Sequence, residues 1–134
     1  MTLSAFLHFR GECAEALAFY AGVFDDPAPV LMPYSEAPGG GDPDRIMYGH
    51  VATGEGNLMA SDYPAGEAGD AQAGVSVCFA TADADRAAGI FAALAEGGAI
   101  LEAWGPSFFS AGFGMLKDRF GTHWIVMVEA TEGG

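Results

Sequence analysis

Basic side chains are scarce in this sequence. Only 5 of its 134 residues are Lys or Arg, against 18 that are Asp or Glu, so the formal net charge is −13 with neutral histidines. A surface of this charge repels phosphate backbones, and the five basic residues form no stripe along the chain. We therefore expect no nucleic-acid partner, and the same charge disfavours binding to anionic membrane surfaces.

Cysteines and long apolar runs are also scarce. Cys13 and Cys78 fall where a helix start and a strand interior are expected, which is not the pattern of a disulfide framework. The longest apolar runs, such as 92–95 and 124–128, are far shorter than the roughly 20 residues that span a bilayer. Residues 1–10 lack the features of a secretory signal. The sequence thus predicts reduced thiols, no membrane span and a cytoplasmic location.

The rest of the composition favours a folded core. Hydrophobic residues make up 51% of the chain and charged residues 17%, which is enough apolar material for one domain of this length. Two alanine-rich stretches, 12–24 and 83–96, carry large apolar residues at helical spacing. Placing Tyr20 over Phe91 also places Ala16 over Ala87, at a constant offset of 71 (91 minus 20). We interpret this as an internal repeat.

Strand-like segments surround both predicted helices. One precedes each helix and three follow it, at 3–9, 30–34, 46–53 and 57–61 in the first half and at 75–81, 100–104, 113–117 and 122–128 in the second. Residues 54–56 and 118–121 have the composition of tight turns, whereas 36–44 and 63–74 are rich in Pro and Gly and predict an exposed loop and a linker. Both halves therefore predict a βαβββ module, about 1–62 and 74–130. Since one sheet alone would leave an apolar face bare, we expect a single α+β domain, 1–134, with a shared core.

Three segments resemble the PhnB-like branch of the glyoxalase/bleomycin-resistance/extradiol-dioxygenase (vicinal-oxygen-chelate) superfamily. They are the GECAEALAFY stretch at 11–20, the LMASD strand end at 58–62 and the FGMLKDRFGTHW hairpin at 113–124. Ser107, Phe108 and Phe109 stand where the family usually has an aromatic pair ending in Trp. The hairpin is the most specific of these segments, and together they cover nearly the whole chain.

The resemblance implies two βαβββ modules that form a glyoxalase-like curved sheet around a cleft, and a homodimer. Members of the superfamily often bind a divalent metal in the cleft and act as isomerases, lyases or dioxygenases, while others only sequester a small molecule. Some PhnB-like proteins are named 3-demethylubiquinone methyltransferases. This chain has no glycine-rich strand-to-helix turn of the kind that cradles a nucleotide-like cofactor, so we predict no cofactor.

The positions of the family's metal ligands hold poor donors in this chain. In metal-dependent relatives, four His or Glu ligands come from the first and last strands of each module. Counting from the helices and the final turns places Ala5, Ser76, Ala60 and Ile125 at those positions, with a possible slip to Met59. A catalytic divalent metal typically takes about three imidazole or carboxylate donors from the protein. The sequence therefore predicts no metal ligands.

Histidines and aromatic residues supply the candidate ligand-binding site. His50 and Tyr48 stand where the family often has Glu and His, on one face of one strand by period-two spacing. His123 begins the last strand and shares the parity of Ile125. With a wall of Trp104, Phe108, Phe109, Phe113 and Met115, these groups could bind a small molecule or provide a weak general base, although a structural role for each is also open.

Two further side chains are assigned structural roles. His8 has the opposite strand parity to Ala5 and should face the helix or an edge. Cys13 opens a helix, where the dipole can lower a thiol pKa, but packing is the preferred account.

The leading hypothesis is therefore a small-molecule-binding protein with a degenerate metal site. The alternatives are a metal-dependent lyase, isomerase or dioxygenase with a rearranged ligand set centred on His50, and a purely structural or regulatory dimer.

Overall fold

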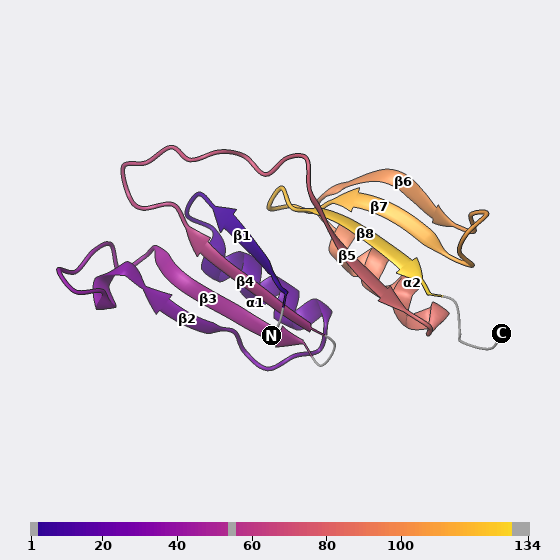
Figure 1. The fold of residues 1–134 in the computed structure, drawn as a ribbon, viewed down its shortest axis with the longest axis horizontal. Helices are drawn as coiled ribbons and strands as arrows, with labels where there is room; N and C mark the ends of the chain where they lie inside the picture. The colour runs from indigo at the N-terminus through magenta and orange to yellow at the C-terminus, as the bar shows by residue number, and fades with distance from the viewer. Residues whose placement is uncertain (1–2, 54–55, 130–134) are drawn as a thin grey trace. The chain divides into compact units, whose positions relative to one another are not determined.

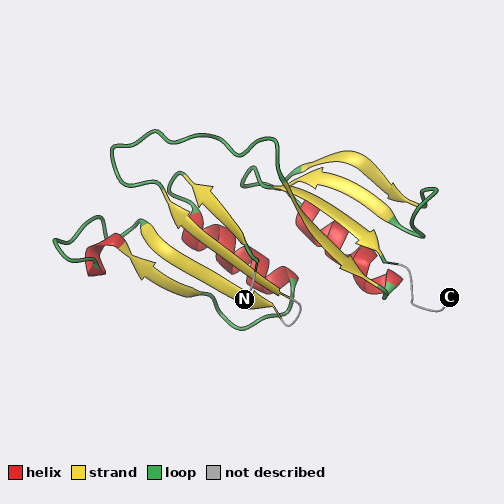
Figure 2. Cartoon of the chain, in the orientation of Figure 1, coloured by secondary structure: helices red, strands yellow, loops and turns green. Residues whose placement is uncertain are grey.

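The computed structural model describes residues 3–53 and 56–129. The chain divides into two compact units, Met1–Ala71 and Gln72–Gly134. The first contains β1 (Ala5–Phe9), α1 (Cys13–Val23), β2 (Val30–Pro33), the short 3-10 helix η1 (Tyr34–Glu36), β3 (Ile46–Thr53) and β4 (Gly56–Asp62). The second contains β5 (Ser76–Thr81), α2 (Ala84–Ala95), β6 (Ala99–Gly105), β7 (Phe113–Lys117) and β8 (His123–Val128). These elements confirm the α+β fold of two βαβββ modules, and a long loop connects the modules (Figure 1, Figure 2).

The two sheets have the same topology. Their strand orders are β1-β4-β3-β2 and β5-β8-β7-β6. In each module the first strand therefore lies at one edge of the sheet, next to the last strand, which lies inside it. That pair is parallel in both modules, whereas the other pairs are antiparallel. The turn predicted at 54–56 has its first two residues outside the described ranges.

Each helix packs on one face of its own sheet. Tyr20 and Leu17 of α1, like Phe91 and Leu94 of α2, are buried, as the predicted repeat requires. The helices begin in different ways. The Asp83 side chain accepts a hydrogen bond from Arg86 N at 3.1 Å and so caps α2, whereas Glu12, the residue before α1, makes no side-chain cap.

Two glycines at matching positions let the helices lie close to the sheets. A Cβ on Gly49 of β3 would lie 2.6 Å from Leu17 of α1, and a Cβ on Gly114 of β7 would lie 2.5 Å from Phe91 of α2. Gly49 pairs with Ala60 and Gly114 with Val126, so the internal repeat extends from the helices into the strands.

The glycines also identify the sheet faces, because side chains alternate along a strand. Residues next to Gly49 and Gly114 point away from the helices. We call the helix-free side of each sheet its open face. It carries Phe6, His8, Tyr48, His50 and Met59 in the first module, and Ser76, Cys78, Met115, His123 and Ile125 in the second.

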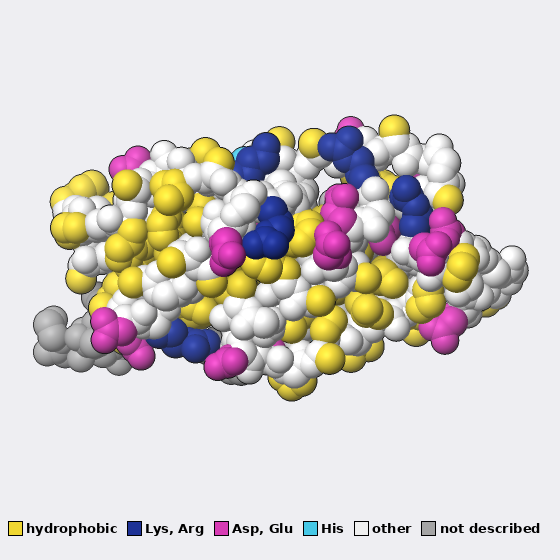
Figure 3. All heavy atoms as spheres, turned by 180° about the vertical axis from the view of Figure 1, so that it is seen from behind, with side chains coloured by type: hydrophobic (Ala, Val, Ile, Leu, Met, Phe, Trp, Pro, Cys, Tyr) yellow, Lys and Arg dark blue, Asp and Glu magenta, His cyan; other side chains and the backbone are white. Residues whose placement is uncertain are grey.

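The structure also bears on possible membrane and nucleic-acid contacts. Across residues 3–53 and 56–129, no helix is long and apolar enough to cross a bilayer. On the face seen in Figure 3, Lys and Arg side chains form separate groups among Asp and Glu.

Candidate functional site

Tyr48 and His50 lie together on the open face of the first module. Their rings stack with centroids 6.2 Å apart, and Phe6 of β1 lies 6.5 Å from Tyr48. The strand register explains this grouping, because Met59 of β4 pairs with both Phe6 and His50. Phe6 and Met59 therefore extend the predicted pair into a mixed aromatic and polar surface.

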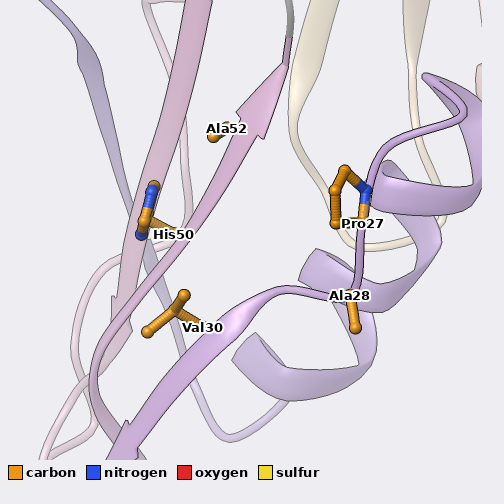
Figure 4. Close-up of a pocket in the computed structure, with 5 residues that line it drawn as sticks. All are labelled: Pro27, Ala28, Val30, His50 and Ala52. Carbon is orange, nitrogen blue, oxygen red and sulfur yellow. The ribbon is translucent and has the colours of Figure 1, made fainter.

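His50 also lines a small pocket at the edge of this sheet. The pocket has a volume of about 130 Å³ and is formed by Pro27, Ala28, Val30, His50 and Ala52. Figure 4 shows His50 and Ala52 on β3, Val30 on β2, and Pro27 and Ala28 on the segment that leads to β2. The Nδ1 atom of His50 is buried without a hydrogen-bond partner in the described part of the chain. A buried polar atom in this state typically costs about 1–3 kcal/mol.

His8 lies on the edge strand β1, one of the two predicted alternatives, but its side chain is on the open face and not toward the helix. Its ring lies 5.2 Å from Phe6 and 5.6 Å from Tyr63, and its Nδ1 is 3.4 Å from Ser61 Oγ. Of the two alternatives, a position facing α1 is excluded, because Leu7 and Phe9 are the buried residues of β1.

The second module carries the other predicted residues. Met115, His123 and Ile125 share its open face, where Met115 pairs with Ile125 and His123 with Ser76. The Nδ1 atom of His123, like that of His50, is buried and has no hydrogen-bond partner in the described ranges.

An aromatic cluster lies next to that face. Phe109 makes edge-to-face contacts with Phe108 and Phe113, each with centroids 5.1 Å apart. Phe108 is fully exposed and Phe109 half exposed, so both are accessible within the module.

Trp104 lies elsewhere. Its ring packs on Phe91 of α2 at 5.4 Å, and a Cβ on Gly112 would lie 2.6 Å from it, which places it on the helix-covered side. The prediction that Trp104 joins the wall around Met115 therefore needs correction. Register shifts on either side of Glu102 break the alternation of β6, so parity could not be followed to Trp104.

The predicted metal positions divide between the two faces. Ser76 and Ile125 lie on the open face, but Ala5 shares the helix side with Leu7, and Ala60 is fully buried there. For Ala5, which was placed by counting from the helix, the cause is a difference in loop length. Three residues separate β1 from α1, whereas two separate β5 from α2, so the offset of 71 slips by one in the strands. The open-face residues of β1 and β4 nearest the counted positions are Phe6 and Met59, and neither is a normal ligand.

The chemistry of these positions does not fit the family's divalent metal. Ser76 offers one hydroxyl, and the other three positions offer no carboxylate or imidazole. Within the described residues, no group of three His, Cys, Asp or Glu side chains could hold a metal ion.

Asp62 is a structural residue that sequence reasoning missed. It is buried, and its Oδ1 accepts hydrogen bonds from Gly11 N at 2.8 Å and Cys13 N at 3.0 Å, while its Oδ2 accepts one from Ile46 N at 2.9 Å. Burial, with a smaller contribution from the negative charge of Asp62, raises the pKa of the Cys13 thiol to about 12. Cys13 is therefore a packed thiol, as preferred, and its helix position does not lower its pKa.

Known proteins similar to this chain share its sequence pattern and fold. A family model described as 3-demethylubiquinone-9 3-methyltransferase matches residues 1–127. The Escherichia coli (strain K12) protein YjdN is 28% identical over 142 residues, which cover 96% of this chain and 95% of YjdN.

Solved structures agree with these matches. The crystal structure of PA1353 from Pseudomonas aeruginosa has a TM-score of 0.88 at 33% identity, over 96% of this chain and 98% of that one. A Bacillus cereus protein described as a putative 3-demethylubiquinone-9 3-methyltransferase, PhnB protein, has a TM-score of 0.76 at 25% identity, over 96% and 99%. A glyoxalase/bleomycin resistance protein from Albidiferax ferrireducens shares the fold alone, with a TM-score of 0.66 at 15% identity over 96% and 99%. The chain therefore belongs to the 3-demethylubiquinone-9 3-methyltransferase family.

Proposed function

We propose that this protein binds a small molecule on the open faces of its modules and that its metal site is degenerate. The observation that carries the proposal is the pocket beside His50, whose buried Nδ1 has no hydrogen-bond partner in the described ranges. A half-turn of the imidazole about its Cβ–Cγ bond exchanges Nδ1 with Cδ2. We expect this flip to bring the nitrogen to a hydrogen-bonding ligand bound on the open face.

The surroundings of His50 suit a partly apolar ligand. Val30, Pro27 and the two alanines give the pocket an apolar lining, and the Tyr48 ring stacks beside the imidazole. Ligand sites typically combine such a lining with a few polar groups that fix orientation. In the second module, Met115, His123, Phe108 and Phe109 supply the same two kinds of group.

Metal-dependent lyase, isomerase or dioxygenase chemistry is the second candidate. It would require a rearranged ligand set centred on His50, and the neighbours of His50 on the open face are Tyr48 and Met59. Neither is a common ligand for a divalent ion, so this candidate ranks below metal-free binding. A purely structural dimer is the third candidate, and it would leave the pocket without a ligand.

The strand-to-helix turns of this chain do not support the methyl transfer that the family's name describes. The strand-to-helix turns are residues 10–12 and 82–83, and only the first contains a glycine. The N–H of that residue, Gly11, donates to Asp62 and is not available to a cofactor phosphate or carboxylate. These turns do not fit a nucleotide-like cofactor.

The proposal places the protein in the cytoplasm. Cys13 and Cys78 are both free, one buried and one exposed, which suits a reducing compartment.

The test combines metal analysis with native mass spectrometry on full-length protein purified without added metal. We expect less than stoichiometric metal and a retained or added small molecule whose binding weakens at least fivefold in His50→Ala. Glu15→Ala, on the exposed side of α1, is the matched control and should bind normally. Stoichiometric metal that His50→Ala removes would establish the metal-dependent candidate instead.

A further inference from the structure

We propose that the second module binds the anionic end of an organic acid, at a row formed by Ser76, His123 and Lys117. This inference rests on the proposed ligand-binding function and names the chemical class of the ligand.

Strand register brings the three side chains together. His123 of β8 pairs with Ser76 of β5 on one side and with Lys117 of β7 on the other. All three lie on the open face, because the neighbouring residues Trp124 and Leu116 are buried on the helix side. Neighbouring strands lie about 4.7–4.9 Å apart, so Ser76 and Lys117 flank His123 on either side and a carboxylate bound over the middle strand would lie close to all three.

Lys117 is an uncompensated cation in this module. Arg119 donates from Nε and one terminal nitrogen to Glu96 O, at 3.1 and 2.9 Å, and the Arg86 guanidinium lies over the Phe79 ring at 5.8 Å. Among the described residues, the Lys117 side chain has no hydrogen-bond or ion-pair partner. In a chain with net charge −13, an anion that reaches this row must overcome general repulsion, so the local cation decides where it binds.

The internal repeat supplies a comparison within the same molecule. Lys117 lies three residues after Gly114 in β7, and Ala52 lies three residues after Gly49 in β3. Their partners are His123 and Asn57. The row therefore contains a lysine in the second module and only neutral residues in the first. Because both modules fold with the same topology, the lysine is not needed for folding.

The adjoining row fixes the rest of the ligand. Ile125 and Met115 pair with each other one row further along the open face and offer an apolar surface next to Lys117. Glu102 pairs with Met115 at the far end of that row and disfavours a second negative charge there. The ligand is thus an acid with one anionic end and an apolar body.

The test is an NMR titration of the full chain with benzoate, benzamide and inorganic phosphate. We expect benzoate to shift the backbone amides of Ser76, Lys117 and His123 in a saturable way, with benzamide at least tenfold weaker. Lys117→Gln and His123→Gln should each weaken benzoate at least fivefold. Arg10→Gln removes the same charge from an exposed position in the first module and should change the affinity less than twofold.

Each contrary result has a defined meaning. Equal binding of benzamide, or an unchanged affinity in Lys117→Gln, overturns the proposal. Phosphate binding as tightly as benzoate would show selection for charge alone and would overturn the organic-acid assignment. If Arg10→Gln weakened benzoate binding as much as Lys117→Gln, the effect would come from net charge and the proposal would be overturned. If benzoate does not bind at Ser76, His123 and Lys117 but His50→Ala still weakens the binding of a small molecule, the anion site is excluded and the proposed ligand-binding function is retained.

Discussion

The buried carboxylate of Asp62 accepts a hydrogen bond from the backbone N–H of Cys13, at 3.0 Å, across 49 positions of the sequence. Asp62 thereby caps α1 from β4, in place of Glu12, which makes no cap. Its second oxygen accepts from Ile46 N at the start of β3, and its backbone O accepts from the Tyr34 hydroxyl at 2.7 Å. One residue therefore ties a helix, two strands and a 3-10 turn together in the first module.

Asp62→Asn should destabilise the protein. The amide keeps the size of the carboxylate but leaves at least one of three backbone N–H donors without an acceptor, which typically costs about 1–3 kcal/mol per group. We expect the free energy of unfolding in urea to fall by about 2–4 kcal/mol. Asp70→Asn, in the exposed linker, is the control and should change it by less than about 0.5 kcal/mol. Equal effects of the two changes would show that Asp62 is not a structural cap.

The Cys13 thiol should be unreactive in the folded protein, because burial, aided by Asp62, raises its pKa to about 12. In a disulfide-exchange assay at pH 8, we expect Cys78 to react and Cys13 to react only after unfolding. The raised pKa also makes stability depend on pH. The folded state keeps a proton that the unfolded chain loses near its usual value of 9.0, so this contribution is complete below about pH 9 and is lost as pH rises toward 12. Modification of Cys13 at the rate of Cys78 would contradict the burial.

Most of the fold could be predicted because its signals are local. Hydrophobic spacing located both helices to within one or two residues, and the predicted bounds of the β3 and β7 strands match the structure. The face of β1 could not be predicted by counting from the helix. One extra residue between β1 and α1 reverses which side chains face the helix, and only the packing of Leu7 and Phe9 reveals it.

The candidate site was predictable only in part, for a related reason. Tyr48 and His50 alternate regularly along β3, so their shared face followed from spacing alone. Trp104 lies within the second of two register shifts in β6, and Asp62 accepts hydrogen bonds from backbone groups distant in sequence. Neither relationship leaves a periodic pattern. That the two modules form one domain around a shared cleft stays a prediction.

Two glycine substitutions should have opposite effects. Gly114→Ala would place a Cβ 2.5 Å from the Phe91 ring, which must move within a packed layer, so we expect a loss of about 1–3 kcal/mol in the free energy of unfolding. Gly89→Ala, in α2, would meet no atom within 4 Å, and alanine should stabilise the helix by about 0.5–1 kcal/mol. Thermal and urea unfolding of both variants measure the difference. A Gly114→Ala protein as stable as Gly89→Ala would mean that α2 lies further from β7 than described.

The protein should be a homodimer, because its edge strand β2 is apolar and exposed. Val30, Leu31 and Met32 are 55%, 38% and 42% exposed within the chain, and an uncovered edge of this kind favours pairing with a second copy. Light scattering at micromolar concentration should give the dimer mass. Met32→Lys should shift the protein toward the monomer, because a charge would have to be buried at the interface. Ala92→Lys makes the same charge change on the exposed side of α2 and should leave the mass unchanged. A monomeric wild-type protein would contradict pairing outright, whereas a dimer that resists Met32→Lys would exclude β2 as the contact and direct attention to Phe108, the fully exposed ring of the second module.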